Sequence, residues 1–412
     1  MLPPVLEIYV VWHPGDAVGR EIADEVVAHF HGTLFSGLVG GAVEVYVRSV
    51  GWANTGDAPR PIYLPGDTPP AAVPLAQLTA VVPVLGLELA SALEDPTNAW
   101  TAYLSRLVAA HAEHAERVRL FPVRADSAAT TGTKLAGVIG NIQCIAIPSG
   151  NNEPRATLLC RDLAQGIAQL ATPSPDPLTV FISHTKHASK GEKDNVAALI
   201  EQVRSVVAQT RLREFFDAHD LQPGRDWDER LRQEAATGAL LALRTDLYPS
   251  REWCQREVLT AKRAGMPLVI LDALGQGEER GSFLMDHAPR VPVRGESGAW
   301  SREQVLAGLN ILVDECLKRA LWNRQHQLAL EHGVTDVAWW APHAPEPTTL
   351  LHWFQSHPPG GSQSAAEDLR VLHPDPPLGP DERAVLEELA AFGGLTGKLD
   401  LLTPRLLASR GG

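Results

Sequence analysis

The stretch "ALLALRTDLYPSREWCQREVLTAKRAGMPLVILDAL", residues 239–274, decides the fold. It begins and ends with an apolar run, and the polar segment between the two runs has the pattern of a helix. Ser250 is a favourable N-cap residue for this helix, and Gly265 followed by Pro267 is a typical stop signal. A buried strand, a helix and a second buried strand in this order predict two parallel strands of one sheet.

One side chain of this helix is not explained by its neighbours in the sequence. Cys254, Val258 and Ala261 are spaced i, i+4 and i+7, which predicts an apolar stripe facing the core. Trp253 and Glu257 form the adjoining row. A surface glutamate often pairs with a Lys or Arg three or four positions away, and Glu257 has none at those spacings. It is therefore solvated at the edge of a packed face, paired with a distant cation, or required for chemistry.

Length and composition limit the class of protein. The chain has 412 residues, 44% of them apolar and 21% charged, which predicts a globular protein of two or three domains. It contains no apolar run long enough for a membrane span, and its start lacks the basic residues of a secretory signal. The net charge of -13 argues against binding to nucleic acid or directly to a membrane. Four scattered cysteines without CxxC spacing favour a reducing compartment, so we expect a cytoplasmic location.

Two proline-rich stretches, residues 171–177 and 341–347, divide the chain into three parts. We predict domains over 1–172 and 178–326 and a small α/β C-terminal region over 333–412. In the first two parts apolar runs alternate with helical patterns. This alternation predicts two flavodoxin-like α/β domains in tandem, each with a parallel sheet and helices on both faces. The third part is short for an independent fold, and we expect it to pack on the preceding domain.

The predicted elements of the middle part form a five-stranded α/β layer. Its expected strands are 178–184, 212–217, 239–245, 267–274 and 291–294. In addition to the helix within 239–274, helices are expected at about 195–209, 227–238 and 301–326.

The first two parts also resemble each other. The segment 80–104 parallels 238–259, since in both a buried strand leads through a polar loop to a helix that carries a tryptophan. Leu104 stands four residues after Trp100, at the position that corresponds to Glu257. An internal duplication and the general likeness of two doubly wound layers explain this equally well. If the duplication is real, the first copy lacks the carboxylate and is not catalytic.

Several familiar motifs fail on inspection. The segment "TTGTK", 130–134, lacks the spacing of a phosphate-binding loop, and neither GxSxG nor HExxH occurs. His111 and His114 are spaced to share a helix face, as are His184 and His187. Neither pair has a clustered third ligand in the sequence, so we predict no metal site.

Three motifs in order make the middle part resemble a known family. They are "VFISHTKH" (180–187), "FFDAHDLQPGRDW" (215–227) and "PSREWCQRE" (249–257), and "SFLMDHAP" (282–289) fits a fourth position loosely. With these motifs, residues 178–320 resemble a Toll/interleukin-1 receptor (TIR) domain of the bacterial kind. Under the duplication interpretation the first part would be TIR-like too.

The resemblance implies a role for Glu257. In enzymatic TIR domains a glutamate at this position is the catalytic residue that cleaves NAD+ between nicotinamide and ribose. Nicotinamide is cationic in NAD+ and leaves as a neutral group, so one carboxylate can suffice where other glycoside hydrolases need two. That carboxylate stabilises the positive charge that develops on the ribose. Trp253 on the same helix face can wall the site or stack on a ring, or it can be a core residue that fixes the helix.

The remaining candidate residues follow from the expected position of the site at the carboxyl ends of the strands. The substrate-binding candidates besides Trp253 are Ser183, His184, Thr185, Asp217, Arg225 and Trp227. By resemblance, Ser183 and the loop after it contact substrate, and the loop after the Pro-Gly turn gates the site. Arg225 either approaches a pyrophosphate or is an ordinary solvated loop residue.

The resemblance implies an NAD+ glycohydrolase (NADase) that releases nicotinamide with ADP-ribose or a cyclic isomer. NAD+ is then the substrate, and no separate cofactor is expected. In this family such activity serves bacterial antiviral defence and signal transduction, is turned on by homo-oligomerisation through TIR domains, and needs a trigger or partner protein. One alternative is a non-enzymatic TIR adaptor that acts through TIR–TIR association. Another makes the first domain or the C-terminal region a nucleotide-signal receptor, with the enzyme as its output.

Overall fold

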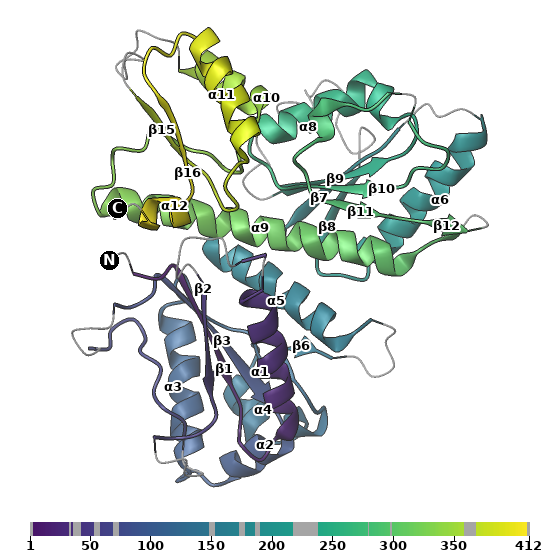
Figure 1. Cartoon of the computed structure of the whole chain (residues 1–412). Helices are drawn as coiled ribbons and strands as arrows, with labels where there is room; N and C mark the ends of the chain where they lie inside the picture. Colours follow the sequence, from purple (N-terminus) through teal and green to yellow (C-terminus); the bar gives the residue numbers. More distant parts are fainter. Residues whose placement is uncertain are drawn as a thin grey trace, which may run out of the picture. The chain divides into compact units, whose positions relative to one another are not determined.

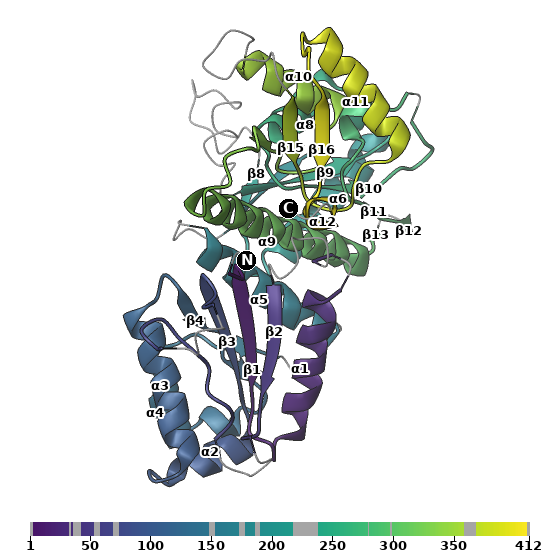
Figure 2. The same ribbon diagram turned by 60° about the vertical axis from the view of Figure 1, so that its left-hand side comes forward.

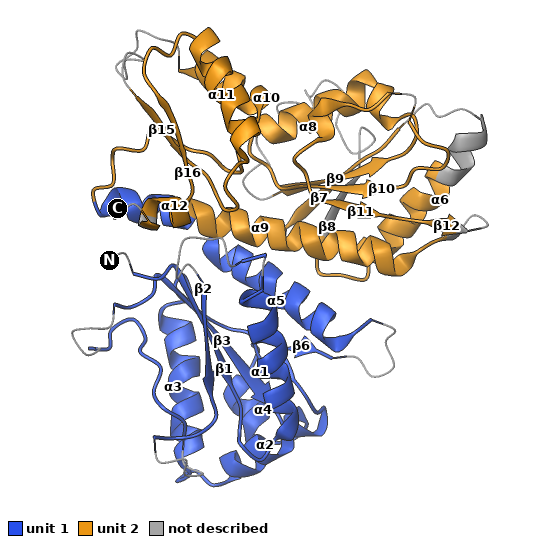
Figure 3. Ribbon diagram, in the orientation of Figure 1, with its two compact units in different colours: residues 1–171, 324–332 blue, residues 172–323, 333–412 orange. Residues whose placement is uncertain are grey.

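The computed structural model of the chain describes residues 3–32, 34–35, 43–52, 58–68, 74–147, 153–172, 178–185, 190–216, 238–278, 280–296, 299–357 and 368–409. The chain divides into two compact units (Figure 3). The N-terminal unit comprises Met1–Ala171 and Arg324–His332, and the C-terminal unit comprises Thr172–Asn323 and Gly333–Gly412. Within the described ranges, no helix has both the length and the apolar character that a membrane crossing requires.

The N-terminal unit is built on a parallel sheet of order β2-β1-β3-β5-β6, with β4 also paired to β3 (Figure 1). Its strands are β1 (Leu6–Val11), β2 (Val43–Arg48), β3 (Leu78–Leu85), β4 (Val118–Leu120), β5 (Val123–Arg124) and β6 (Ile145–Ala146). Every residue of β1 and β3 is buried, which is the pattern of central strands covered on both faces.

Helices cover both faces of this sheet (Figure 2). One face packs against α1 (Ala17–Phe30) and α5 (Arg155–Ala171), which contact each other. The other face packs against α2 (Leu87–Glu94), α3 (Ala99–Glu113) and α4 (Lys134–Ile139), with the short helix η1 (Ala128–Thr130) beside them.

The main sheet of the C-terminal unit is also parallel, with the order β11-β10-β9-β7-β8. Its strands are β7 (Thr179–Ser183), β8 (Arg213–Phe216), β9 (Gly238–Arg244), β10 (Leu268–Asp272) and β11 (Arg290–Pro292). Counted along the chain, this is the 2-1-3-4-5 order of flavodoxin-like folds. The predicted α/β class with parallel sheets is therefore confirmed. The sheet of the N-terminal unit follows the same pattern when β4 and β5, which both pair with β3, are counted as one strand. This likeness is compatible with both a duplication and the general similarity of doubly wound layers.

Residues 239–274 form the expected strand, helix and strand. Helix α8 (Glu252–Arg263) follows the short helix η2 (Tyr248–Ser250), and its predicted stripe of Cys254, Val258 and Ala261 packs on the core formed with β7, β9 and β10. Gly265 has a φ of 65°, and the amides of Gly265 and Met266 close the helix on the carbonyls of Lys262 and Ala261.

The other face of this sheet packs against α6 (Lys190–Val207) and α9 (Arg302–Glu331). Gly308 of α9 lies directly on Leu271, since a Cβ at Gly308 would stand 2.2 Å from Leu271 Cδ2. The predicted helix at 227–238 lies outside the described residues, apart from Gly238, which begins β9. A short helix η3 (Phe283–Met285) and an antiparallel pair, β12 (Gly295–Glu296) with β13 (Ala299–Trp300), complete this part.

The C-terminal region forms a small parallel sheet of order β14-β15-β16 with its own apolar core. Its elements are β14 (Trp339–Trp340), α10 (Pro347–Ser356), β15 (Leu369–Leu372), α11 (Pro380–Phe392), β16 (Leu399–Leu402) and α12 (Pro404–Ser409). The region packs on α8 of the same unit. Lys262 Nζ of α8 lies 2.7 Å from Glu346 Oε2, which stands at the start of α10, and both side chains are buried.

Candidate active site

Ser183 is the last residue of β7 and brings a hydroxyl group to the carboxyl edge of the sheet. Its side chain is buried, and its Oγ donates a hydrogen bond to Glu257 Oε2. The structure thus brings together two residues that are 74 positions apart in the sequence. Their meeting point lies where open α/β sheets bind ligands.

Glu257 is buried, with 3% of its surface exposed, although the sequence offered no local partner. Its Oε2 accepts from Ser183, and its Oε1 accepts from Trp253 Nε1 at 2.5 Å. A buried carboxylate is costly unless it is hydrogen bonded, and bonds to a charged acceptor are among the stronger ones. The interpretation of Glu257 as a solvated surface residue is therefore wrong, because these donors replace water.

Trp253 lies on the solvent side of this carboxylate. Its side chain is 39% exposed, and the guanidinium of Arg256 lies 6.0 Å from the ring centroid. Trp253 is therefore not a core tryptophan. One edge of its indole is bonded to Glu257, and part of the ring is exposed.

Tyr248 completes the group and is missing from the candidates that the sequence suggested. Its side chain is fully buried, and its hydroxyl lies 2.5 Å from Ser183 Oγ. Burial raises the pKa of Tyr248 well above 10.0, and Cys254 and Glu257 raise it further. The phenol therefore stays protonated. The only signal in the sequence was a tyrosine in the loop between a buried strand and the helix that carries Glu257.

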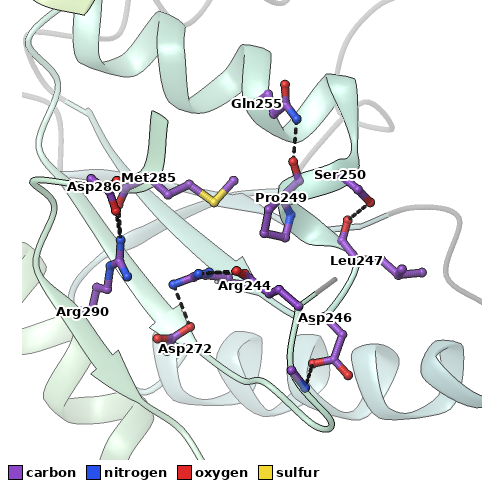
Figure 4. Close-up of polar contacts among 12 residues, drawn as sticks. Arg244, Asp246, Leu247, Pro249, Ser250, Gln255, Asp272, Met285, Asp286 and Arg290 are labelled. Atoms are coloured by element: carbon purple, nitrogen blue, oxygen red, sulfur yellow. Dashed lines mark hydrogen bonds and ion pairs between the residues drawn. The ribbon is translucent and has the colours of Figure 1, made fainter. Parts of the chain in front are cut away.

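The chain between β9 and α8 is braced by its own polar groups (Figure 4). Gln255 Nε2 donates to the carbonyl of Pro249 at 2.5 Å, and Ser250 Oγ donates to the carbonyl of Leu247 at 2.8 Å. The prediction that Ser250 caps α8 is wrong, because the helix begins one residue later and Arg251 is its N-cap. The serine hydroxyl bonds backwards within η2, a common alternative to capping.

His184 and Thr185 follow β7 at the same edge. The carbonyl of His184 accepts from Cys254 Sγ at 3.6 Å, which ties this loop to α8. Thr185 is buried, and its hydroxyl lies 3.5 Å from that of Thr245, which follows β9. The other predicted substrate-binding residues, Asp217, Arg225 and Trp227, lie outside the described residues.

The edge beyond β9 carries a second polar group that the sequence did not indicate (Figure 4). Asp246 accepts hydrogen bonds from the backbone amides of residues 275–277, at 2.9, 2.9 and 3.2 Å. Arg244 pairs with Glu278 and with Asp272, and the bond to Glu278 raises the pKa of Arg244. These contacts fix the loop after β10.

In the described part of the chain, this site included, no group of three or more His, Cys, Asp or Glu side chains is placed to hold a metal ion.

The corresponding place in the N-terminal unit is apolar. Trp100 of α3 is 1% exposed, and Leu104 is buried in the same core. At the edge of this sheet Asp16 accepts from the amides of Glu88 and Leu89, at 3.0 and 3.1 Å, and so caps α2. This unit therefore has a leucine in its core where α8 presents Glu257.

No protein-family model and no curated protein matches this chain. Among solved structures, the tagatose-6-phosphate ketose/aldose isomerase from Escherichia coli is similar over 79% of this chain and 84% of that chain, with 9% sequence identity and a TM-score of 0.18. A likeness at this TM-score carries no argument about fold or function.

Proposed function

We propose that the protein is an NAD+ glycohydrolase in which Glu257 is the catalytic residue. The observation that carries the proposal is the carboxylate of Glu257, buried at the carboxyl edge of a parallel sheet and bonded to Ser183 and to the half-exposed Trp253. This is a prepositioned negative charge beside an aromatic ring, which is what cleavage of the nicotinamide-ribose bond needs.

The chemistry requires little else from the chain. The bond between the ribose and the cationic nicotinamide breaks, and the electron pair leaves with the ring nitrogen, so no proton has to be supplied to the leaving group. Glu257 stabilises the positive charge on the ribose until water, or a nucleophile within the same molecule, attacks. The products are nicotinamide with ADP-ribose or a cyclic isomer. We place this activity in the cytoplasm, in a TIR domain that works as a homo-oligomer in antiviral signalling.

The burial of Glu257 also favours a second candidate function. Both carboxylate oxygens are engaged by the protein's own donors, so the same group would serve as a structural tie between β7 and α8 in an adaptor. Such an adaptor would act only through association of its TIR surfaces.

The two functions are separated by following nicotinamide release from NAD+ over a range of protein concentrations. Glu257→Gln should abolish release by the full-length protein, because the amide carries no charge to stabilise the ribose cation. Glu252→Gln is the matched control, since Glu252 is exposed on the same helix and should leave the rate unchanged. Equal rates of nicotinamide release by wild type and Glu257→Gln would contradict the catalytic role of Glu257 and favour a structural one.

A further inference from the structure

The hydroxyl group of Tyr248 has no role in packing. The ring of Tyr248 lies in the apolar core with Phe181, Leu240 and Val258, and a phenylalanine would fill the same space. A buried hydroxyl costs free energy unless it is hydrogen bonded. The hydroxyl of Tyr248 lies within hydrogen-bond distance of Ser183 Oγ, which is in turn bonded to Glu257, so this chain of polar groups ends on the candidate catalytic carboxylate.

The direction of the hydrogens in this chain follows from chemistry. Ser183 has a single hydroxyl hydrogen, and it points at the Glu257 carboxylate. Ser183 Oγ must therefore accept from Tyr248, whose raised pKa keeps its proton in place. The order of donation is Tyr248 to Ser183 to Glu257.

We propose that Tyr248 is a positioning residue that orients the Glu257 carboxylate through Ser183. By accepting from a fixed phenol, Ser183 keeps its own hydrogen directed at Oε2. Glu257 Oε1 then faces the half-exposed Trp253, whose hydrogen bond a ribose hydroxyl can replace. Donors fixed before the reaction need no rearrangement in the transition state. The inference rests on the proposed function of Glu257.

Tyr248→Phe tests the role, because it removes only the hydroxyl group. We expect kcat for nicotinamide release to fall by about tenfold, the effect of one hydrogen bond lost from the transition state, with KM for NAD+ unchanged. Tyr103→Phe is the matched control. Tyr103 is another buried tyrosine, and its hydroxyl donates to the carbonyl of Arg60 in the N-terminal unit, so its loss should leave both constants unchanged.

A double-mutant cycle separates a relay from general loosening of the fold. Ser183→Ala should lower kcat at least as far as Tyr248→Phe, and adding Tyr248→Phe to Ser183→Ala should lower it no further. If the two substitutions lowered kcat independently, so that their fold-losses multiplied in the double variant, this result would overturn the relay from Tyr248 through Ser183. So would a wild-type kcat in Tyr248→Phe alongside an inactive Glu257→Gln, and that result would leave the proposed function intact. Equal rates for wild type and Glu257→Gln would instead contradict the proposed function itself.

Discussion

At the scale of single residues, Trp253 has two separable parts. Its indole nitrogen holds Glu257 Oε1 in the free protein, and its exposed ring can wall or stack on the substrate. The nitrogen and the ring can be removed one at a time. Substitution of Trp253 by tyrosine or leucine is a poor probe, because each of these changes alters polarity and shape together.

Trp253→Phe keeps an aromatic ring and loses the donor. We expect it to retain kcat/KM within about threefold, because a ribose hydroxyl takes over the lost hydrogen bond. Trp253→Ala should lose at least about fivefold, since a ring contact contributes roughly 1 kcal/mol or more. The measurement is steady-state nicotinamide release. Equal losses in both variants would show that the indole nitrogen, and not the ring, is the part that matters.

The sequence predicted the residues of this site that share one helix or end a strand, and it did not predict Tyr248. Trp253 and Glu257 are four positions apart, so their meeting on α8 follows from helical spacing. Ser183 was found because it ends a strand. Tyr248 was not, because its value depends on a hydroxyl partner 65 positions away. Ser250 was wrongly predicted to cap α8, because its hydroxyl group donates to the carbonyl of Leu247 instead.

At the scale of elements, α8 is held at two points of its core face. Midway along the helix Glu257 is bonded to Ser183 of β7, and near the end of the helix Lys262 is buried against Glu346. Lys262 Nζ also donates to the carbonyl of Asp286 at 2.5 Å. The C-terminal region therefore contributes to the position of the helix that carries the site.

Replacing only one partner of the Lys262–Glu346 pair should lower the free energy of unfolding more than replacing both charged residues. Lys262→Met leaves Glu346 buried without its cation, and we expect the free energy of unfolding to fall by about 3–5 kcal/mol. In Lys262→Met with Glu346→Gln, no lone charge remains and the glutamine oxygen can still cap α10, so part of this loss should return. Urea unfolding of the full chain measures both variants. Additive losses would mean that the pair is not coupled.

At the scale of the whole molecule, the order of apolar runs and helices was enough to predict parallel α/β sheets, because the central strands β1, β3, β7 and β9 are buried along their length. The contact between α8 and the C-terminal region was expected only in general terms. The bond of Lys262 to Glu346 spans 84 positions and has no local pattern. Long-range charge pairs of this kind need the folded backbone to bring them together.

The junction of α8, α9 and the C-terminal region should make stability depend on pH. Burial, together with the positive charge of Arg319, lowers the pKa of His343 from 6.5 to about 4, against smaller raising effects of the Ala344 backbone and Glu346. Between pH 6.5 and about pH 4, the imidazole of His343 binds a proton in the unfolded chain but not in the folded chain. The contribution of His343 to stability is therefore fully present above about pH 6.5 and is lost as the pH falls towards 4.

His343→Gln should reduce the slope of the free energy of unfolding against pH within this window. The reduction should correspond to the loss of up to one proton that the unfolded chain binds and the folded chain does not. The change is measured by urea unfolding at a series of pH values from neutral to acid. His31→Gln, at an exposed position after α1, is the control and should leave the slope as it is. An unchanged slope in His343→Gln would mean that His343 titrates alike in the folded and unfolded chain, and the buried junction would then have to admit water.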